Sequence, residues 1–262
     1  EGLKRHDLID LQFDVVRYEM EELKPAGFDP VDQKVHPARP WSGSRGALHL
    51  YLWTDDGVLP RFWFSSGHIY DNRGPLRWKL IDSEGNQVRN GEIPPGPRRR
   101  SKKNWHDQEY THQVDLQAPG PGVYRLEVSN TGQGYFWDYE PRGARLSIRA
   151  DAEKAVRRTW LNRHYFYVPK GKERIVIAGT LRRGRHWWHP GTGESETIDP
   201  KNIRVVQGFT VVPVPENRDG RVWLLRVRKL SHGLRFLNVP GLLAYSPDEL
   251  LLPEKFVKEI DR

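Results

Sequence analysis

The chain contains no cysteine, only one methionine and no long apolar run. Without cysteine it has no disulfide framework, no zinc site with thiolate ligands, no iron–sulfur cluster and no cysteine nucleophile. No run approaches the roughly 18 apolar residues of a membrane-spanning helix, so we expect no such helix. The chain begins at Glu1, and we interpret it as a mature or excised segment of a longer protein.

Long helices are also not expected, because 20 prolines and 24 glycines interrupt the 262 residues. Only 37% of the residues are apolar, but ten Trp, ten Tyr and nine Phe supply large surfaces for burial. This composition excludes a disordered chain. The length suits one or two domains, and we predict two, at residues 1–150 and 151–262.

The net charge of +8 comes from two short basic runs. They hold eight of the 42 basic residues, and the rest of the chain has 34 basic and 34 acidic residues. Both runs lead into Trp and His, at 104–106 and 186–189. Clustered cations beside flat rings can hold an anionic polymer, and a solvated loop is the alternative. The basic residues are Arg98, Arg99, Arg100, Lys102 and Lys103 in the first run, and Arg182, Arg183 and Arg185 in the second.

Apolar and polar residues alternate along most of the chain, which predicts strands with one buried face. For 9–21 we favour a strand with a β-bulge at Val15–Val16, and an amphipathic helix is the alternative. Helical preference is clear only at 151–158, where we place the domain junction. Loops are expected at 24–46, 91–104 and 182–200. The other expected strands are 47–53, 61–65, 76–82, 87–89, 112–117, 122–129, 144–149, 165–169, 174–181, 203–206, 209–214, 221–228 and 234–238.

An internal repeat relates two segments that we expect to be hairpins with a proline turn, 112–128 and 209–227. Each segment reads strand, proline turn, glycine and then aromatic-x-Leu-x-Val, and an aromatic residue follows in each half, Phe136 and Phe236. Upstream we match the aromatic strand at 62–64 with the one at 165–167. The predicted fold class is all-β, with two antiparallel β-sandwich domains of jelly-roll kind in tandem. The matched strand positions are Tyr124, Leu126 and Val128 with Trp223, Leu225 and Val227.

The segment Tyr-Phe-Tyr-Val-Pro-Lys-Gly at 165–171, with Asp-Gly-Arg-Val-Trp-Leu-Leu at 219–225, resembles a known class of domain. The class is the β-sandwich accessory domains of bacterial secreted proteases and polysaccharide-degrading enzymes, namely pre-peptidase C-terminal domains and carbohydrate-binding modules. The resemblance implies a non-catalytic role in an extracellular or periplasmic location. It identifies no binding residues. We expect no cofactor, and a structural calcium ion stays open.

Signals for catalysis and for metal binding are sparse. Adjacent strand residues point to opposite faces, so Asp55 and Asp56 are poorly placed to act as a glycosidase pair. His186 and His189 are the candidate metal ligands, but Gly184 and Pro190 predict a loop around them. A polysaccharide lyase remains possible, because a lyase needs a cation and a proton-abstracting Tyr or His. The residues available for it near the first basic run are Asn104, His106, Tyr110 and His112.

The expected binding site combines the two basic runs with exposed indole rings. Trp105, Trp187 and Trp188 lie in expected loops and are assigned to it with the basic residues named above. Sugar rings stack on such rings. We expect Trp53, Trp63, Trp78 and Trp223, which lie in strands, to be in the core.

The favoured hypothesis is therefore a non-catalytic module that binds polysaccharide, with an acidic polymer as one option, and that supports an attached catalytic domain. The alternatives are a polysaccharide lyase or hydrolase, and a structural or protein-interaction segment. Membrane is excluded as a partner. No RNA- or DNA-binding motif accompanies the basic runs, so nucleic acid is not the favoured partner.

Overall fold

The computed structural model describes residues 13–30, 42–65, 74–95, 111–129, 134–156, 164–178, 186–190, 203–206, 208–227 and 233–260. This part of the chain is mostly strand, and every strand pair in it is antiparallel. The all-β class with antiparallel sheets is thus confirmed. It follows from the alternation of apolar and polar residues, which gives each strand one face to bury.

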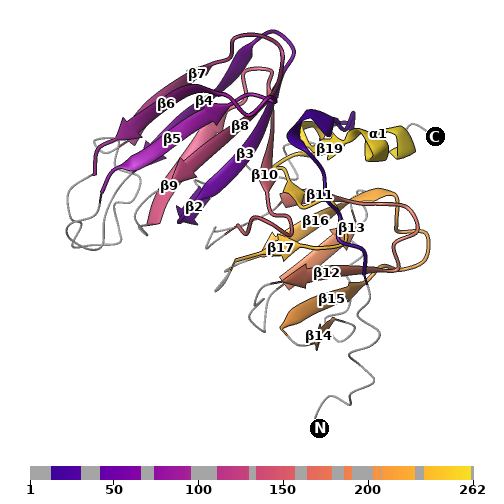
Figure 1. Ribbon diagram of the computed structural model, residues 1–262. Coiled ribbons are helices and arrows are strands. Elements are labelled where there is room, and N and C mark those ends of the chain that lie inside the picture. Colours follow the sequence, from indigo (N-terminus) through magenta and orange to yellow (C-terminus); the bar gives the residue numbers. More distant parts are fainter. Residues whose placement is uncertain are drawn as a thin grey trace.

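The first half folds into two sheets, which lie at the upper left of Figure 1. One is six-stranded, in the order β18-β10-β3-β8-β5-β6, in which β18 (Leu242–Leu243) comes from the second half. The other is four-stranded, in the order β2-β9-β4-β7. Side chains from both sheets share one hydrophobic core. The strands are β2 (Ser42–Arg45), β3 (Leu48–Thr54), β4 (Val58–Ser65), β5 (Leu76–Ile81), β6 (Gln87–Ile93), β7 (Thr111–Gln117), β8 (Gly122–Ser129), β9 (Gly134–Glu140) and β10 (Arg145–Arg149).

The second half has a three-stranded sheet, β11-β16-β13, and a four-stranded sheet, β14-β15-β12-β17. Aromatic side chains from the two sheets pack against each other, and the ring centroids of Phe166 and Phe236 are 4.7 Å apart. The strands are β11 (His164–Val168), β12 (Arg174–Ala178), β13 (His186–Pro190), β14 (Arg204–Val206), β15 (Phe209–Pro213), β16 (Arg221–Val227), β17 (Arg235–Phe236) and β18 (Leu242–Leu243).

The two halves share a strand order. β3-β8-β5 corresponds to β11-β16-β13, and β9-β4-β7 corresponds to β17-β12-β15. The sequence repeat and the sheet topology therefore agree. The strands matched in the sequence are β8 and β16, and each lies between the corresponding neighbours in its sheet. Two details differ from expectation. The proline turns do not close hairpins, since β7 and β8, like β15 and β16, belong to different sheets. The strand at Tyr165–Tyr167 corresponds to β3 and not to the strand at Phe62–Phe64.

Strand β18 joins the halves. It pairs with β10 of the first half, and the next residue, Ala244, exchanges two backbone hydrogen bonds with Tyr165 of β11. Just before β18, the backbone of Gly241 packs directly on Ala150 and Asp151. A Cβ there would lie 2.4 Å from the Asp151 Cα. The close crossing therefore requires glycine at this position.

Segments near both chain ends form a further layer beside the sheets (Figure 1). β1 (Leu23–Pro25) pairs with β19 (Leu251–Pro253), and α1 (Glu254–Ile260) follows at once. Together with Tyr18 and Met20 they cover a second hydrophobic cluster on the outer face of β3, β8, β11 and β16. The single-turn 3-10 helices are η2 (Met20–Glu22) and η6 (Pro247–Glu249).

Five sequence expectations are corrected by the structure. The expected loop at 24–46 contains the strand β2 and the end of β1, because their backbones pair with β9 and β19. Residues 13–19 form no strand, although Tyr18 is buried, because this segment lies in the covering layer and joins no sheet. Residues 151–156 contain no helix, because the Asp151 carboxylate accepts hydrogen bonds from the backbone N–H groups of Glu153 and Lys154. The one α-helix of the described chain is α1. The strand β9 was not expected. His186–Pro190 is a strand rather than a loop, since its backbone pairs with β16.

Candidate functional site

Most of the residues that the sequence assigns to a ligand site lie outside the described residues. These are the first basic run with Trp105, and Arg182, Arg183 and Arg185. Trp187 and Trp188, like His186 and His189, are described by backbone alone, in β13. The two runs also occupy different links of the repeat. Residues 98–105 precede β7, and 182–185 precede β13.

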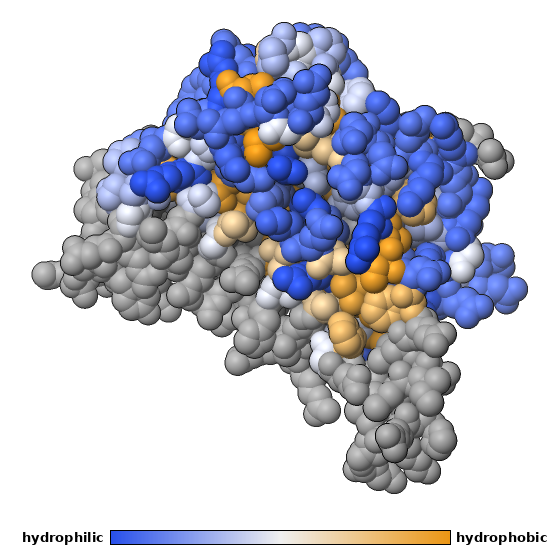
Figure 2. Space-filling view, viewed as in Figure 1, coloured by the Kyte–Doolittle hydropathy of each residue, from blue (hydrophilic) through white to orange (hydrophobic). Residues whose placement is uncertain are grey.

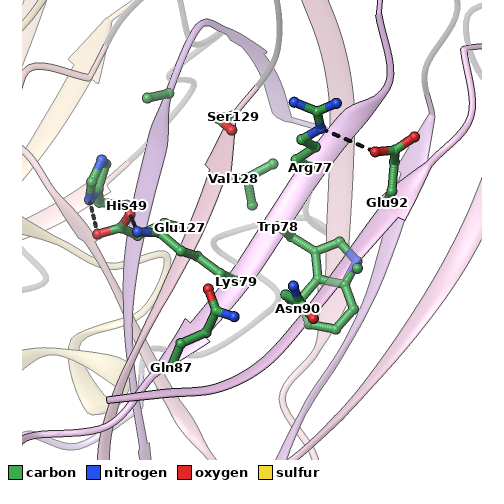
Figure 3. Close-up of a pocket in the computed structure, with 12 residues that line it drawn as sticks. His49, Arg77, Trp78, Lys79, Gln87, Asn90, Glu92, Glu127, Val128 and Ser129 are labelled. Carbon is green, nitrogen blue, oxygen red and sulfur yellow. Dashed lines mark hydrogen bonds and ion pairs between the residues drawn. The ribbon is translucent and has the colours of Figure 1, made fainter. Parts of the chain in front are cut away.

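The structure instead shows a polar pocket of about 470 Å³ on the outer face of the six-stranded sheet (Figure 3). Its floor is a cross-strand row formed by His49, Glu127, Lys79 and Asn90, from four adjacent strands. A second row holds Ser129, Arg77 and Glu92. The remaining lining residues are Ala47, Trp78, Gln87, Gly91 and Val128.

The pocket exists because alternation turns the polar half of each strand outward. On β8, Leu126 and Val128 are fully buried in the core, so Glu127 and Ser129 face the other way. On β5, Leu76 and Leu80 are buried and Arg77 and Lys79 point out. The covering layer reaches only as far as Tyr51, Val123 and Ile81 on this face, and the pocket lies beyond it.

Ion pairs hold the charged side chains of the pocket. Lys79 Nζ lies 2.9 Å from Glu127 Oε2, and Arg77 Nε donates to Glu92 Oε2 at 3.1 Å. Arg125, in the next row, lies 2.9 Å from the other oxygen of Glu127. The lining groups therefore neutralise each other, while the side chains of Lys79, Glu92 and Arg77 remain 45%, 54% and 70% exposed.

Burial lowers the pKa of His49 to about 4, and the carboxylate of Glu127, with Oε1 3.5 Å from His49 Nδ1, only partly opposes this. Burial also raises the pKa of Glu127, but the hydrogen bond from Lys79 and the charges of His49 and Arg125 outweigh it. Its pKa lies below the ordinary value. At neutral pH, His49 is therefore neutral and Glu127 is ionised.

Trp78 borders the pocket next to the edge strand β6, but its side chain lies between Leu76 and Leu80 on the inner face of the sheet. Its indole ring lies flat on Gly91, where a Cβ would be 2.5 Å from the ring. It packs against the main core and is half-buried. Of the other strand tryptophans, Trp223 is fully buried as expected, while Trp53 is half-buried and donates its indole N–H to Asp55 Oδ1 at 2.8 Å.

The pocket could not be predicted from the sequence, because polar residues that alternate with apolar ones are typical of any solvent-facing side of a strand. Only the pairing of β3, β8, β5 and β6 brings the groups together, and strand alternation does not specify pairing. Within the described residues no group of three His, Asp or Glu could hold a metal ion. No described helix is long and apolar enough to cross a bilayer.

Comparisons with known proteins found no matching family model, no matching curated protein and no matching solved structure. The chemistry of the pocket therefore has to carry the functional argument.

Proposed function

We propose that this protein is a non-catalytic module that binds polysaccharide through the polar pocket, as an accessory to a secreted carbohydrate-active enzyme. The finer architecture behind this proposal is a tandem of two sandwich units of jelly-roll kind. The observation that carries the proposal is the alternation of donors and acceptors along the row His49–Glu127–Lys79–Asn90.

Sugar hydroxyls donate and accept hydrogen bonds at once, so a site for them needs both kinds of group close together. Lys79 and Arg77 offer only donors, Glu127 and Glu92 offer only acceptors, and Asn90 offers both. A volume of about 470 Å³ is within the range of small-ligand pockets, which are usually lined by apolar side chains. Eight of the twelve lining residues carry polar side chains, and the carbon atoms of the lining supply apolar surface between the polar groups. This mixture suits a sugar, whose hydroxyls surround an apolar C–H face.

The titration of the pocket favours binding over hydrolysis. A glycosidase needs a carboxylic acid whose pKa is raised so that it can donate a proton at neutral pH. The pKa of Glu127 is lowered instead, because Lys79 and Arg125 stabilise the carboxylate. His49, with a pKa of about 4, is a weak base for lyase chemistry near pH 7.

Affinity electrophoresis tests the proposal. The protein is run through gels that contain galactomannan, xylan, hydroxyethyl cellulose, alginate or polygalacturonate, at low and moderate salt. We expect retardation in at least one gel and its loss in Lys79→Met, which removes the ammonium but keeps the apolar stem.

The matched control is Lys258→Met. Lys258 also pairs with a carboxylate, Glu254 at 2.6 Å, but lies on α1 away from the pocket. The proposal fails if the wild-type protein is retarded in none of the gels, or if both variants lose retardation equally.

A further inference from the structure

The outer face of the four-stranded sheet carries an unexpected tryptophan. On β4, Phe62 and Phe64 are fully buried in the core, so Trp63 between them points to the opposite side. Trp63 is half-buried and belongs to neither hydrophobic cluster of the structure. No described residue accepts a hydrogen bond from its indole N–H. The prediction that Trp63 is a core residue is therefore wrong.

Polar side chains surround this indole ring on both neighbouring strands. Asp138 of β9 and Gln113 of β7 lie directly opposite Trp63. The adjacent row, about 7 Å along the strands, places Arg61 between Glu140 and Asp115.

Hydrogen bonds fix the polar groups of this face in place. Arg61 Nε donates to Asp115 Oδ1 at 2.7 Å, and Gln113 Nε2 donates to Asp115 Oδ2 at 2.6 Å. Arg61 Nη1 reaches Glu140 Oε2 at 3.5 Å. The face thus consists of one ring with ordered donors and acceptors beside it.

We propose that this face is a second binding surface, on which a neutral polysaccharide chain stacks one sugar ring against Trp63. The proposal rests on the proposed function and adds to it a class of ligand and a second site. The apolar C–H face of a sugar ring can cover an indole ring, while hydroxyls at the ring edge meet the flanking amide and carboxylate groups. The strand pairing on either side of β4 gives a continuous surface along which a chain can lie.

The charged side chains beside Trp63 favour a neutral polysaccharide over an anionic one. The described cations beside Trp63 are Arg61 and Arg142, and both are paired with the carboxylates of Asp115 and Glu140. A uronate polymer or a nucleic acid would have to compete with these carboxylates for the two arginines and would lie beside like charge. A chain without charge avoids this repulsion.

The two sites lie on opposite outer faces of one pair of sheets, since Glu127 and Trp63 each alternate with residues of the shared core. One molecule can therefore hold two chains, or two parts of one chain, and gain avidity.

The test compares Trp63→Ala, Trp63→Tyr and the control Trp53→Leu in gels containing a neutral polymer (galactomannan, xylan or hydroxyethyl cellulose) or an anionic one (alginate or single-stranded DNA). Trp53 is also half-buried, but its ring is held by Asp55 and by Lys24, whose Nζ lies 5.2 Å from the ring centroid. We expect Trp63→Ala to raise the apparent dissociation constant about tenfold. Trp63→Tyr, which keeps a stacking ring, should retain most of the affinity, and Trp53→Leu all of it.

Several results would overturn the inference. In the first, Trp63→Ala is retarded like the wild type in every gel in which Lys79→Met is not retarded. The pocket would then be the binding site, and the proposed function would stand without a second site. Another is an effect of Trp63→Ala confined to alginate or to single-stranded DNA, which would contradict the neutral class. No retardation of the wild-type protein in any gel would remove the proposed function itself, and this inference with it. Urea unfolding of Trp63→Ala, expected to match the wild type within about 1 kcal/mol, shows that a loss of binding is not a loss of fold.

Discussion

The outer faces of β8 and β16 occupy equivalent places in the repeat and have opposite characters. Matching Leu126 with Leu225 sets Arg125 of the first half against Leu224 of the second. Arg125 is paired with Glu127 at the border of the pocket. Leu224 is buried in the second hydrophobic cluster. One strand order therefore supports either an open polar face or an interior face.

The difference follows from what covers each sheet. Over β11, the Tyr167 hydroxyl donates to Glu259 Oε1 of α1 at 2.8 Å, and the Lys170 backbone N–H donates to the same oxygen at 2.6 Å. Over β3 the cover stops at Tyr51, and His49, two residues earlier, borders the open pocket. The covering layer therefore decides which outer face stays open, because both faces belong to sheets with the same strand order.

Hydropathy on the surface gives the same contrast. In Figure 2 the part formed by the first half is mostly hydrophilic, and hydrophobic residues gather over the sheet that contains β12 and β15. Val205, on the edge strand β14 of that sheet, is 64% exposed.

Exchanging the residue types at the equivalent positions 125 and 224 should give the largest effect on stability. Leu224→Arg places an unpaired charge in the second cluster, and we expect it to lower the free energy of unfolding by roughly 3–5 kcal/mol. Arg125→Leu should cost about 1 kcal/mol or less, because it removes a partly exposed ion pair. Urea denaturation of both variants measures the difference. Equal losses would show that the two faces do not differ in burial as described.

The junction between the faces should be the next most sensitive place. A Cβ at Gly241 would lie 2.4 Å from the Asp151 Cα and 2.5 Å from the Ala150 carbonyl oxygen, and backbone cannot move aside easily. We expect Gly241→Ala to cost about 3 kcal/mol. Thermal unfolding measures this loss. Gly120→Ala is the control, because nothing lies within 4 Å of a Cβ there, and it should unfold like the wild type.

Alternation in the sequence was enough to predict most strands and the burial of Trp223, but it did not say which face of each strand is buried. The run Phe62-Trp63-Phe64 is aromatic on both faces, so its pattern cannot say which rings point inward. Partner strands and the shared core settle this, and they come from distant parts of the chain.

The covering layer was the hardest part to predict. Tyr18 and Met20 alternate as in a strand and both are buried, yet the backbone of their segment has no sheet edge to join. Val16 instead donates its N–H to the Leu237 carbonyl oxygen at 2.8 Å. Alternation records burial on one side, and it cannot record which neighbour supplies the hydrogen bonds. The pocket was missed for the same reason.

The repeat also identifies a misfit in the second half. His164 occupies the place that Leu50 has in the first, is fully buried, and neither ring nitrogen has a hydrogen-bond partner. An unsatisfied buried polar group costs roughly 1–3 kcal/mol. We therefore expect His164→Leu to raise the free energy of unfolding by about this amount at pH 7, as measured in urea. Leu50→His is the reverse exchange and should destabilise the first half.

The pH dependence of His164→Leu sharpens this prediction. Burial lowers the pKa of His164 to about 3, against an ordinary value of 6.5. Between these values the unfolded chain binds a proton that the folded chain does not, so stability falls as the pH drops below 6.5. The slope is about 1.4 kcal/mol per pH unit for one group. The advantage of His164→Leu over the wild type should therefore grow between pH 6.5 and 4.5. A constant advantage would mean that His164 is protonated in the folded protein.

The smallest effect on stability is expected in the pocket itself, where it is most informative. Arg77 and Glu92 form an ion pair with side chains 70% and 54% exposed, so Arg77→Ala should change the free energy of unfolding by about 0.5 kcal/mol or less. The same variant removes two or more donors from the pocket wall and should weaken retardation in the polysaccharide gels. Retained binding with reduced stability would assign Arg77 to the scaffold. Weakened binding at unchanged stability is expected only where exposed side chains contact a ligand. A substitution in the buried face of the second half would lower stability instead.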